Sequence, residues 1–230
     1  MVRLLTPVRI QGTFGKALNF DGVDDYVDCG NDESLNPTEE ITLCAWVLLR
    51  EKKTQGIIGK DGYWHLECYG DSAKFAFEGY FGDKWRLLLS DYHPELNEWY
   101  FVCSVFRANY AGLYVNGEEV KSDDWGEGIG TLASRKVYVG KTTWAYFAGD
   151  GKKFNGTIDE VRIYNRALTQ EEIIQLYGGG HIWKGLVLWL KFNEGSGTTA
   201  YDSSGYGNHG TINGATWTDR GAMILRSPVR

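Results

Sequence analysis

Short strand-like runs separated by turn residues recur along most of this chain. Runs rich in β-branched, aromatic or alternating apolar side chains occupy residues 16–20, 26–29, 41–49, 63–69, 73–78, 85–90, 99–106, 112–116 and 136–140. Gly, Asn and Asp fill the intervals, and 30 of the 230 residues are glycine. The Asn116-Gly117 pair lies between two such runs, which is a strong hairpin signal. The pattern predicts an all-β protein with antiparallel strands.

One segment has the signature of a helix. Thr169 is placed as its N-cap, Glu172 completes a capping box, and Leu168 can pack against Ile173 as a hydrophobic staple. Gly178 follows as the expected left-handed residue after the helix end. We therefore expect one short helix near residues 170–177.

Charge and hydropathy exclude several classes of partner. The chain has 24 basic and 30 acidic residues, a net charge of −6 and no cluster of Lys and Arg. Binding to a nucleic-acid backbone needs a basic face, so we expect no nucleic-acid partner. No apolar run approaches the roughly 20 residues of a membrane-spanning helix, so we expect no membrane insertion. The first residues lack the apolar stretch and cleavage site of a signal peptide, so no secretion signal is visible in this chain.

The four cysteines do not have the spacing of a metal or redox motif. Cys29, Cys44, Cys68 and Cys103 contain no C-x-x-C pair. Cys44 and Cys103 lie within apolar strand-like runs, which favours buried free thiols. Two disulfides are the alternative, because an even number of cysteines allows complete pairing.

Five blocks of sequence carry a family resemblance. Residues 15–27, 41–47, 98–102, 113–117 and 156–168 resemble the laminin-G-like jelly roll of the concanavalin A-like lectin/glucanase superfamily. The blocks appear in the order of that family. The resemblance implies a two-sheet antiparallel jelly-roll sandwich, a common lectin and capsid architecture. We therefore expect residues 1–230 to form a single sandwich.

The last part of the chain departs from the family order. Residues 186–217 resemble the opening strands of the domain but follow the helix, so the segment order is circularly permuted. These strands either complete their own sandwich, which we favour, or insert into a neighbouring chain and build a strand-exchanged assembly. Residues 1–14 and 218–230 contain similar strings, 4–9 and 224–230, and form terminal arms that either end as edge strands or mediate self-assembly.

The sequence does not indicate catalysis. Glycoside hydrolases use a pair of carboxylates, and hydrolases of this superfamily place theirs on one strand in alternating positions. No strand here has that pattern, and the adjacent Asp159 and Glu160 should point to opposite faces of a strand. No histidine has a Ser or Cys partner at motif spacing. We therefore expect no enzyme activity.

An oxygen-rich loop is the candidate metal site. Residues 202–208 combine Asp, Ser, Asn and Gly, a composition that suits Ca²⁺ but also a metal-free loop of Asx turns. The resemblance implies a structural calcium near this loop, with Asp202, Asn208 and Asp159 as side-chain ligands. Asp21, Asp24 and Asp25 form a second acidic turn and a second candidate.

Three aromatic residues are candidates for contact with a sugar ring. Trp125, Trp144 and Tyr146 lie in loops, whereas Trp46, Trp99 and Trp189 lie in strands expected to enter the core. The sequence thus predicts a non-catalytic module that binds a glycan or a protein surface, with calcium as its candidate cofactor, at an extracellular, cell-surface or virion location. The alternative is a structural protein of a virion, as capsid, decoration or fibre, or of a cell-surface assembly.

Overall fold

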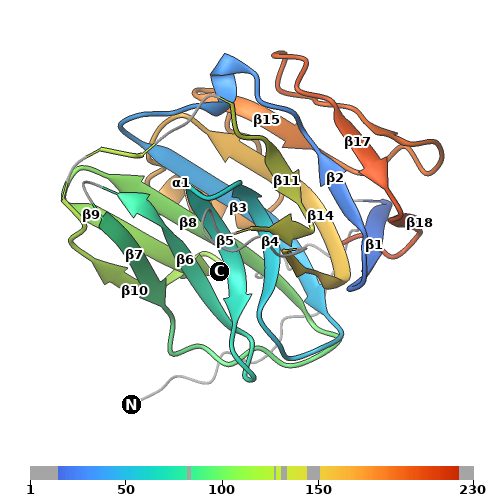
Figure 1. The fold of residues 1–230 in the computed structure, drawn as a ribbon, viewed down its shortest axis with the longest axis horizontal. Coiled ribbons are helices and arrows are strands. Elements are labelled where there is room, and N and C mark those ends of the chain that lie inside the picture. The colour runs from blue at the N-terminus through green and yellow to red at the C-terminus, as the bar shows by residue number, and fades with distance from the viewer. Residues whose placement is uncertain (1–14, 82–83, 127, 131–133, 144–150, 223–230) are drawn as a thin grey trace, which may run out of the picture.

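Two antiparallel sheets packed face to face form the molecule (Figure 1). The computed structural model describes residues 15–81, 84–126, 128–130, 134–143 and 151–222. One α-helix, α1 (Gln170–Tyr177), and one short 3-10 helix, η1 (Glu33–Leu35), accompany the sheets within these residues. The expected all-β sandwich with a single short α-helix is confirmed for this part of the chain.

Sheet 1 contains the longest strands. Its order is β10 (Glu118–Asp123), β9 (Tyr110–Val115), β8 (Trp99–Arg107), β3 (Ile41–Leu49), β14 (Asn155–Tyr164), β1 (Ala17–Asp21) and β18 (Thr216–Thr218), and β15 (Leu186–Leu190) also pairs with β14. The edge of β14 away from β3 is shared: its first half pairs with β1 and its second half with β15.

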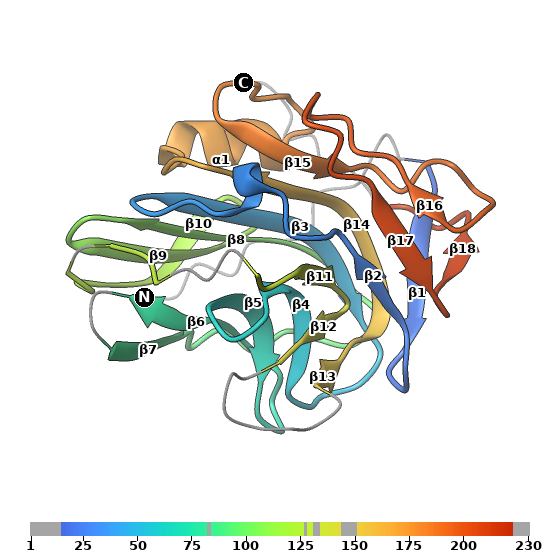
Figure 2. The ribbon, with the colours of Figure 1, turned by 45° about the horizontal axis from the view of Figure 1, so that its top comes forward.

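Sheet 2 faces sheet 1 across the core. Its order is β16 (Thr199–Ala200), β17 (Gly210–Asn213), β2 (Tyr26–Asp28), β11 (Val137–Val139), β4 (Gln55–Lys60), β5 (Trp64–Tyr69), β6 (Lys74–Phe81) and β7 (Lys84–Leu89). A separate two-stranded hairpin, β12 (Lys141–Thr142) with β13 (Lys152–Lys153), packs near β4. Figure 2 shows α1 beyond sheet 1 and this hairpin at the other side of the stack.

Strand alternation assigns each side chain to the core or to an outer face. On β5, Trp64, Leu66 and Cys68 join the core between the sheets, and the intervening His65 and Glu67 therefore face outward. A second apolar cluster lies on the outer face of sheet 1, where Ile173 and Leu176 of α1 pack against the sheet. Both faces of sheet 1 are therefore apolar, which explains why β3 has bulky residues at alternate and intervening positions.

The two strongest local signals in the sequence correspond to real elements. Asn116 and Gly117 have φ angles of 53° and 85° and form a two-residue turn between β9 and β10. Thr169 accepts a hydrogen bond from the Glu172 amide, and the Glu172 side chain accepts one from the Thr169 amide, so the capping box is complete.

The end of α1 differs by one residue from the expectation. Gly178 is the C-cap with a φ of −75°, and the left-handed residue is Gly179, with a φ of 82°. The glycine run tolerates this shift because either residue can adopt a positive φ without a clash of a Cβ atom.

The strands of residues 186–217 pair within this chain. β15 pairs with β14, β17 with β2, and β18 with β1, so these late strands lie beside the earliest strands of the fold (Figure 1). Leu188 and Leu190 of β15 enter the central core. The pairings agree with the permuted order inferred from the resemblance, because the late strands fill positions beside early ones.

The terminal arms are only partly described. Residues 1–14 and 223–230 lie outside the described residues. The start of the second arm is part of the fold: Thr218 pairs with Ala17, and the buried Ala222 donates its amide hydrogen to Asp159 Oδ2 at 2.8 Å. Residues 218–222 are thus held against sheet 1, where β18 is an edge strand, and the roles of the terminal arms stay predictions.

The structure contains a disulfide where free thiols were favoured. Cys44 on β3 and Cys103 on β8 are directly opposite in the sheet register and form a disulfide bond. Cys29 and Cys68 are buried free thiols. The expectation is therefore wrong for Cys44 and Cys103, because strand pairing brings together two side chains that are 59 residues apart in the sequence.

Candidate functional site

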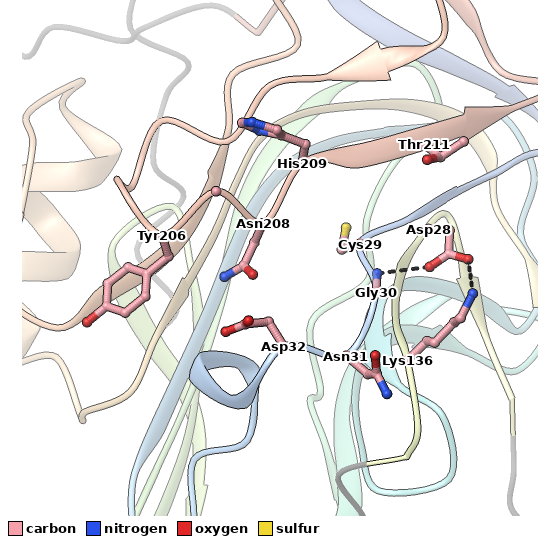
Figure 3. Close-up of a pocket in the computed structure, with 11 residues that line it drawn as sticks. Asp28, Cys29, Gly30, Asn31, Asp32, Lys136, Tyr206, Asn208, His209 and Thr211 are labelled. Carbon is pink, nitrogen blue, oxygen red and sulfur yellow. Dashed lines mark hydrogen bonds and ion pairs between the residues drawn. The ribbon is translucent and has the colours of Figure 1, made fainter.

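An open pocket of about 380 Å³ lies at one end of sheet 2, where β2, β11 and β17 are neighbours (Figure 3). Its walls come from three separate segments of the chain. They are Asp28, Cys29, Gly30, Asn31, Asp32, Lys136, Tyr206, Gly207, Asn208, His209 and Thr211. The lining is mainly polar.

Asp28 contacts several of the residues that line the pocket. It is the last residue of β2 and lies opposite Tyr138 of β11 and Thr211 of β17. Its neighbour Val27 faces the core, so alternation directs Asp28 outward. Asp28 Oδ1 accepts a hydrogen bond from the Gly30 amide at 2.9 Å, and Asp28 Oδ2 lies 2.7 Å from Lys136 Nζ. This hydrogen bond and the charge of Asp28 raise the pKa of Lys136, so the ammonium group stays charged at neutral pH.

Asp32 provides a second carboxylate. It is the N-cap of η1, and its Oδ1 accepts hydrogen bonds from the amide and the hydroxyl of Ser34. These hydrogen bonds lower the pKa of Asp32. Its Oδ2 has no hydrogen-bond partner among the described residues and is therefore available to a ligand. Asn208 lies across from Asp32 in Figure 3, held by hydrogen bonds from its Nδ2 to Ser34 Oγ and to the Val187 carbonyl, both 2.8 Å.

The opposite wall depends on Asp202. Asp202 Oδ1 accepts the amides of Trp189 and Ser204, and Oδ2 accepts the Ser204 hydroxyl and the Asn208 amide. Because Trp189 belongs to β15, these bonds tie the loop of residues 202–209 to sheet 1. The carboxylate thus fixes the loop conformation in the way typical of Asx turns.

Tyr206 lies at the tip of this loop and its side chain remains accessible. The residue is 56% exposed and lines the pocket, and its ring extends outward from the other lining side chains (Figure 3). His209 lies on the same wall, and its ring contacts that of Tyr201 with 5.4 Å between centroids. An accessible ring beside fixed polar groups can contact both the apolar and the hydroxylated parts of a ligand.

The pocket does not have the groups of a nucleophilic active site. Burial, with the nearby Asp28 and Asp202 charges, raises the pKa of the Cys29 thiol far above neutrality, so it stays protonated. Asp28 is engaged by Lys136 and Gly30, and Asp32 caps η1. The arrangement provides donors and acceptors for hydrogen bonds, which suits the binding of a polar molecule.

The residues expected to bind calcium are only partly brought together. Asp202 and Asn208 are joined by the hydrogen bond from the Asn208 amide, 3.0 Å long. Asp159 is buried in sheet 1, where its carboxylate accepts the amides of Glu160 and Ala222, and no hydrogen bond among the described residues joins it to Asp202 or Asn208. Burial raises the pKa of Asp159 well above its usual value. The calcium site stays a prediction.

The second acidic turn does converge. Asp21, Asp24 and Asp25 each place one carboxylate oxygen within 4.8 Å of the others. Asp25 Oδ2 already accepts the Asp21 amide at 2.8 Å, so this carboxylate shapes the turn between β1 and β2.

The aromatic candidates from the sequence do not form the pocket. Trp125 is 1% exposed; its ring stacks on Phe77 at a centroid distance of 5.3 Å and packs at a tilt against Phe81 at 5.0 Å. Its assignment to ligand binding is corrected, because core packing leaves no face of the ring for a sugar. Trp144 and Tyr146 lie outside the described residues.

The relation between Asp159 and Glu160 also differs from the expectation. The register of β14 shifts between Asp159 and Arg162, and Glu160 has a φ of 52°, so simple alternation fails there. Both carboxylates are buried and bond to residues of the cluster on the outer face of sheet 1: Asp159 to Ala222, and Glu160 to Trp189 Nε1 at 2.8 Å. Glu160 also forms a buried ion pair with Arg162.

Two groups of polar residues were missed from the sequence. Asp28 and Asp32 belong to one segment, but Lys136 and Tyr206 are far from it in the chain, and the local signal was the run of polar and glycine residues after β2. The second group comprises His65, Glu67, Glu78 and Lys152, on the outer face of sheet 2. Burial and the charge of Glu78 raise the pKa of Glu67. Burial acts in the same direction on Glu78, but the hydrogen bonds and charges of His65 and Lys152 outweigh it and lower the pKa of Glu78. The two carboxylates lie on neighbouring strands, so a search along one strand could not find them.

Solved structures with a similar fold include three with different described roles. A proposed carbohydrate-binding protein from Bacteroides ovatus is 24% identical with a TM-score of 0.75, and the match covers 93% of this chain and 62% of that one. The pentraxin of Limulus polyphemus is 14% identical with a TM-score of 0.54, covering 72% and 83%. Domain 4 of an extracellular arabinanase from Geobacillus stearothermophilus, in complex with arabinotriose, is 15% identical with a TM-score of 0.51, covering 74% and 99%. The chain thus spans about 62% of the length of the Bacteroides protein.

Sequence comparison identifies the family. No curated protein sequence matches this chain. No helix among the described residues is long and apolar enough to cross a membrane. The family model of the concanavalin A-like lectin/glucanases superfamily of laminin-G type matches residues 21–174, more than half of the chain. With the two-sheet sandwich described above, this match shows that the chain belongs to the concanavalin A-like lectin/glucanases superfamily.

Proposed function

We propose that this chain is a non-catalytic carbohydrate-binding module and that the pocket between β2, β11 and β17 binds the glycan. The observation that carries the proposal is the combination of an accessible Tyr206 ring with polar groups held in fixed positions. A sugar ring has an apolar face that can stack on an aromatic side chain and hydroxyl groups that need hydrogen bonds.

Each polar group has a defined part in this proposal. The Lys136 ammonium donates to a sugar hydroxyl, and the free Oδ2 of Asp32 accepts from one. Asn208 and Asp202 hold the loop that carries Tyr206, so little conformational entropy is lost when the ligand binds. The ion pair of Asp28 with Lys136 keeps both side chains in place.

The comparisons support the ligand class. One similar structure is that of a proposed carbohydrate-binding protein, and another is an arabinanase domain in complex with arabinotriose. The pocket carries the argument, since likeness at this level of identity shows the fold alone. An extracellular or cell-surface location belongs to the same proposal, and the Cys44–Cys103 disulfide is consistent with an oxidising compartment.

The test is binding to a broad glycan panel, followed by calorimetric titration of the best ligand. We expect Tyr206→Ala to weaken binding at least about tenfold, which corresponds to roughly 1.4 kcal/mol. Asp32→Asn should weaken it by a smaller factor, because one charged acceptor is lost. Titrations with added CaCl₂ and after treatment with EDTA test the predicted calcium at Asp202, Asn208 and Asp159.

Trp183→Ala is the matched control. Trp183 is 61% exposed but does not line the pocket, so its loss should leave the affinity unchanged. Absence of binding to every glycan on the panel contradicts the proposed function. Equal affinity of the wild type and Tyr206→Ala contradicts the assignment of the pocket.

A further inference from the structure

Three side chains with metal-ligand chemistry converge on the outer face of sheet 2, away from the pocket. His65 and Glu67 are two residues apart on β5 and therefore share a face. Glu78 lies directly opposite His65 in the register of β5 and β6. The backbone pairing thus fixes the convergence of the three side chains.

The cluster is compact and buried. One ligand atom of each residue lies within 4.8 Å of the others. His65 and Glu67 are 0% exposed, and Glu78 is 1% exposed. His65 Nδ1 lies 3.5 Å from Glu78 Oε1, at the limit of a hydrogen bond.

The hairpin of β12 and β13 covers the cluster. Thr142 Oγ1 donates to Glu67 Oε2 at 3.2 Å. Gly56 of β4 allows this approach, since a Cβ atom there would lie 2.4 Å from the Thr142 amide nitrogen. The hairpin also supplies Lys152, whose Nζ lies 2.7 and 2.9 Å from the two carboxylate oxygens of Glu67 and 3.1 Å from Glu78 Oε1.

Two features of the cluster point to a cation site. His65 Nε2 is buried and has no hydrogen-bond partner among the residues that the structure describes, although an unpaired buried polar atom is unfavourable. Among the described residues, the ammonium group of Lys152 also lies within hydrogen-bond distance of both Glu67 and Glu78, so these two acidic side chains share one cation. A divalent cation would balance both carboxylates.

We propose that His65, Glu67 and Glu78 form a binding site for a divalent transition-metal ion of the zinc class, which replaces the ammonium group of Lys152. One imidazole nitrogen with two carboxylates is a donor set that suits Zn²⁺ and related ions, whereas Ca²⁺ and Mg²⁺ prefer oxygen ligands alone. The position of Lys152 Nζ among three carboxylate oxygens marks where a cation is held. The Lys152 side chain is 19% exposed, so it can move outward.

The experiment is a calorimetric titration of the full chain with ZnCl₂ after dialysis against EDTA, with the bound metal counted by elemental analysis. We expect one Zn²⁺ per chain. His65→Gln and Glu78→Gln should each weaken binding at least about tenfold. Lys152→Met should strengthen it several-fold, because the competing ammonium is removed. If the cluster is only a structural ion network, Lys152→Met should not strengthen Zn²⁺ binding. It should instead lower the melting temperature, and added Zn²⁺ should not restore it.

His93→Gln is the matched control, because His93 is an exposed histidine outside the cluster and its loss should not change the titration. Circular dichroism checks the fold of each variant. If Glu78→Gln does not fold, the visible absorption spectrum of the Co²⁺-loaded wild type, compared with that of His65→Gln, decides whether an imidazole is bound. Unchanged Zn²⁺ affinity or an unchanged Co²⁺ spectrum in His65→Gln overturns the proposal. If the wild type binds one Ca²⁺ as tightly as one Zn²⁺, the proposal is also overturned. These results do not bear on the glycan pocket.

Discussion

Lys60 is a single buried residue that should lower the stability of the fold. It lies on β4, is 0% exposed, and its Nζ donates to the Arg135 carbonyl at 2.6 Å. Burial lowers the pKa of Lys60 from 10.5 to about 8, because the charged ammonium loses its hydration. A lysine whose pKa is lower in the folded than in the unfolded state destabilises the fold at every pH at which it is charged.

We predict that Lys60→Met raises the free energy of unfolding by roughly 2 kcal/mol at pH 7, given about 1.4 kcal/mol for each pKa unit and some loss of contacts. In the wild type, the contribution of Lys60 to the free energy of unfolding is most favourable above pH 10.5. It declines as the pH falls to about 8 and stays low below that pH. The advantage of the variant should therefore disappear above pH 10.5. Urea denaturation across this range measures it, with the exposed Lys84→Met as control. A variant less stable than the wild type at pH 7 contradicts the prediction.

The aromatic residues illustrate the limit of inference from residue type. Trp125 and Tyr206 both lie in turns rich in Asp, Ser or Gly, yet Trp125 is buried among Phe77 and Phe81 and Tyr206 is exposed. Residue type and local sequence are similar in the two cases. Only the arrangement of the surrounding strands decides which ring is available to a ligand.

Short-range sequence signals were sufficient to predict the bounds of single elements. Features that depend on pairing between distant strands could not be predicted from them. The bounds of β3 and α1 agree with the sequence because alternation and the capping box act within a few residues. The bulge at Glu160 and the disulfide between β3 and β8 depend on partners far away in the chain.

The disulfide should make a large contribution to stability. Cys44 and Cys103 are 59 residues apart, and closing a loop of that length lowers the entropy of the unfolded chain by an amount worth up to about 4 kcal/mol. We predict that the double variant Cys44→Ala/Cys103→Ala loses a substantial part of this amount in urea denaturation. Dithiothreitol should destabilise the wild type and leave the double variant unaffected. An equal effect of dithiothreitol on both proteins contradicts the disulfide.

The position of residues 186–217 is a property of the whole molecule. Their strands pair with β14, β2 and β1, and Leu188, Leu190 and Phe192 fill the central core. Removing them would expose the edges of both sheets and part of the core at once. The late strands are therefore integral to this sandwich.

We predict that the chain has the mass of a single copy, 25.9 kDa, in size-exclusion chromatography with light scattering. The physical reason is that every late strand finds its partner within the chain, so no neighbouring chain is needed to complete a sheet. The measurement is repeated at low and high protein concentration. A stable dimer or larger species at both concentrations would favour exchange of residues 186–217 between chains.

Local patterns in the sequence are enough to predict the class of the fold, the helix of residues 170–177, the hairpin at Asn116-Gly117 and the superfamily. These follow from periodicity, capping and turn chemistry, which act over a few residues, and from motif blocks in a known order. The three-dimensional arrangement of the strands is needed to see which side chains share a pocket, such as Asp32 with Tyr206, and which share a buried cluster, such as His65 with Glu78. In an antiparallel sandwich these neighbours come from strands far apart in the chain, and their contact depends on register and burial, which no local pattern specifies.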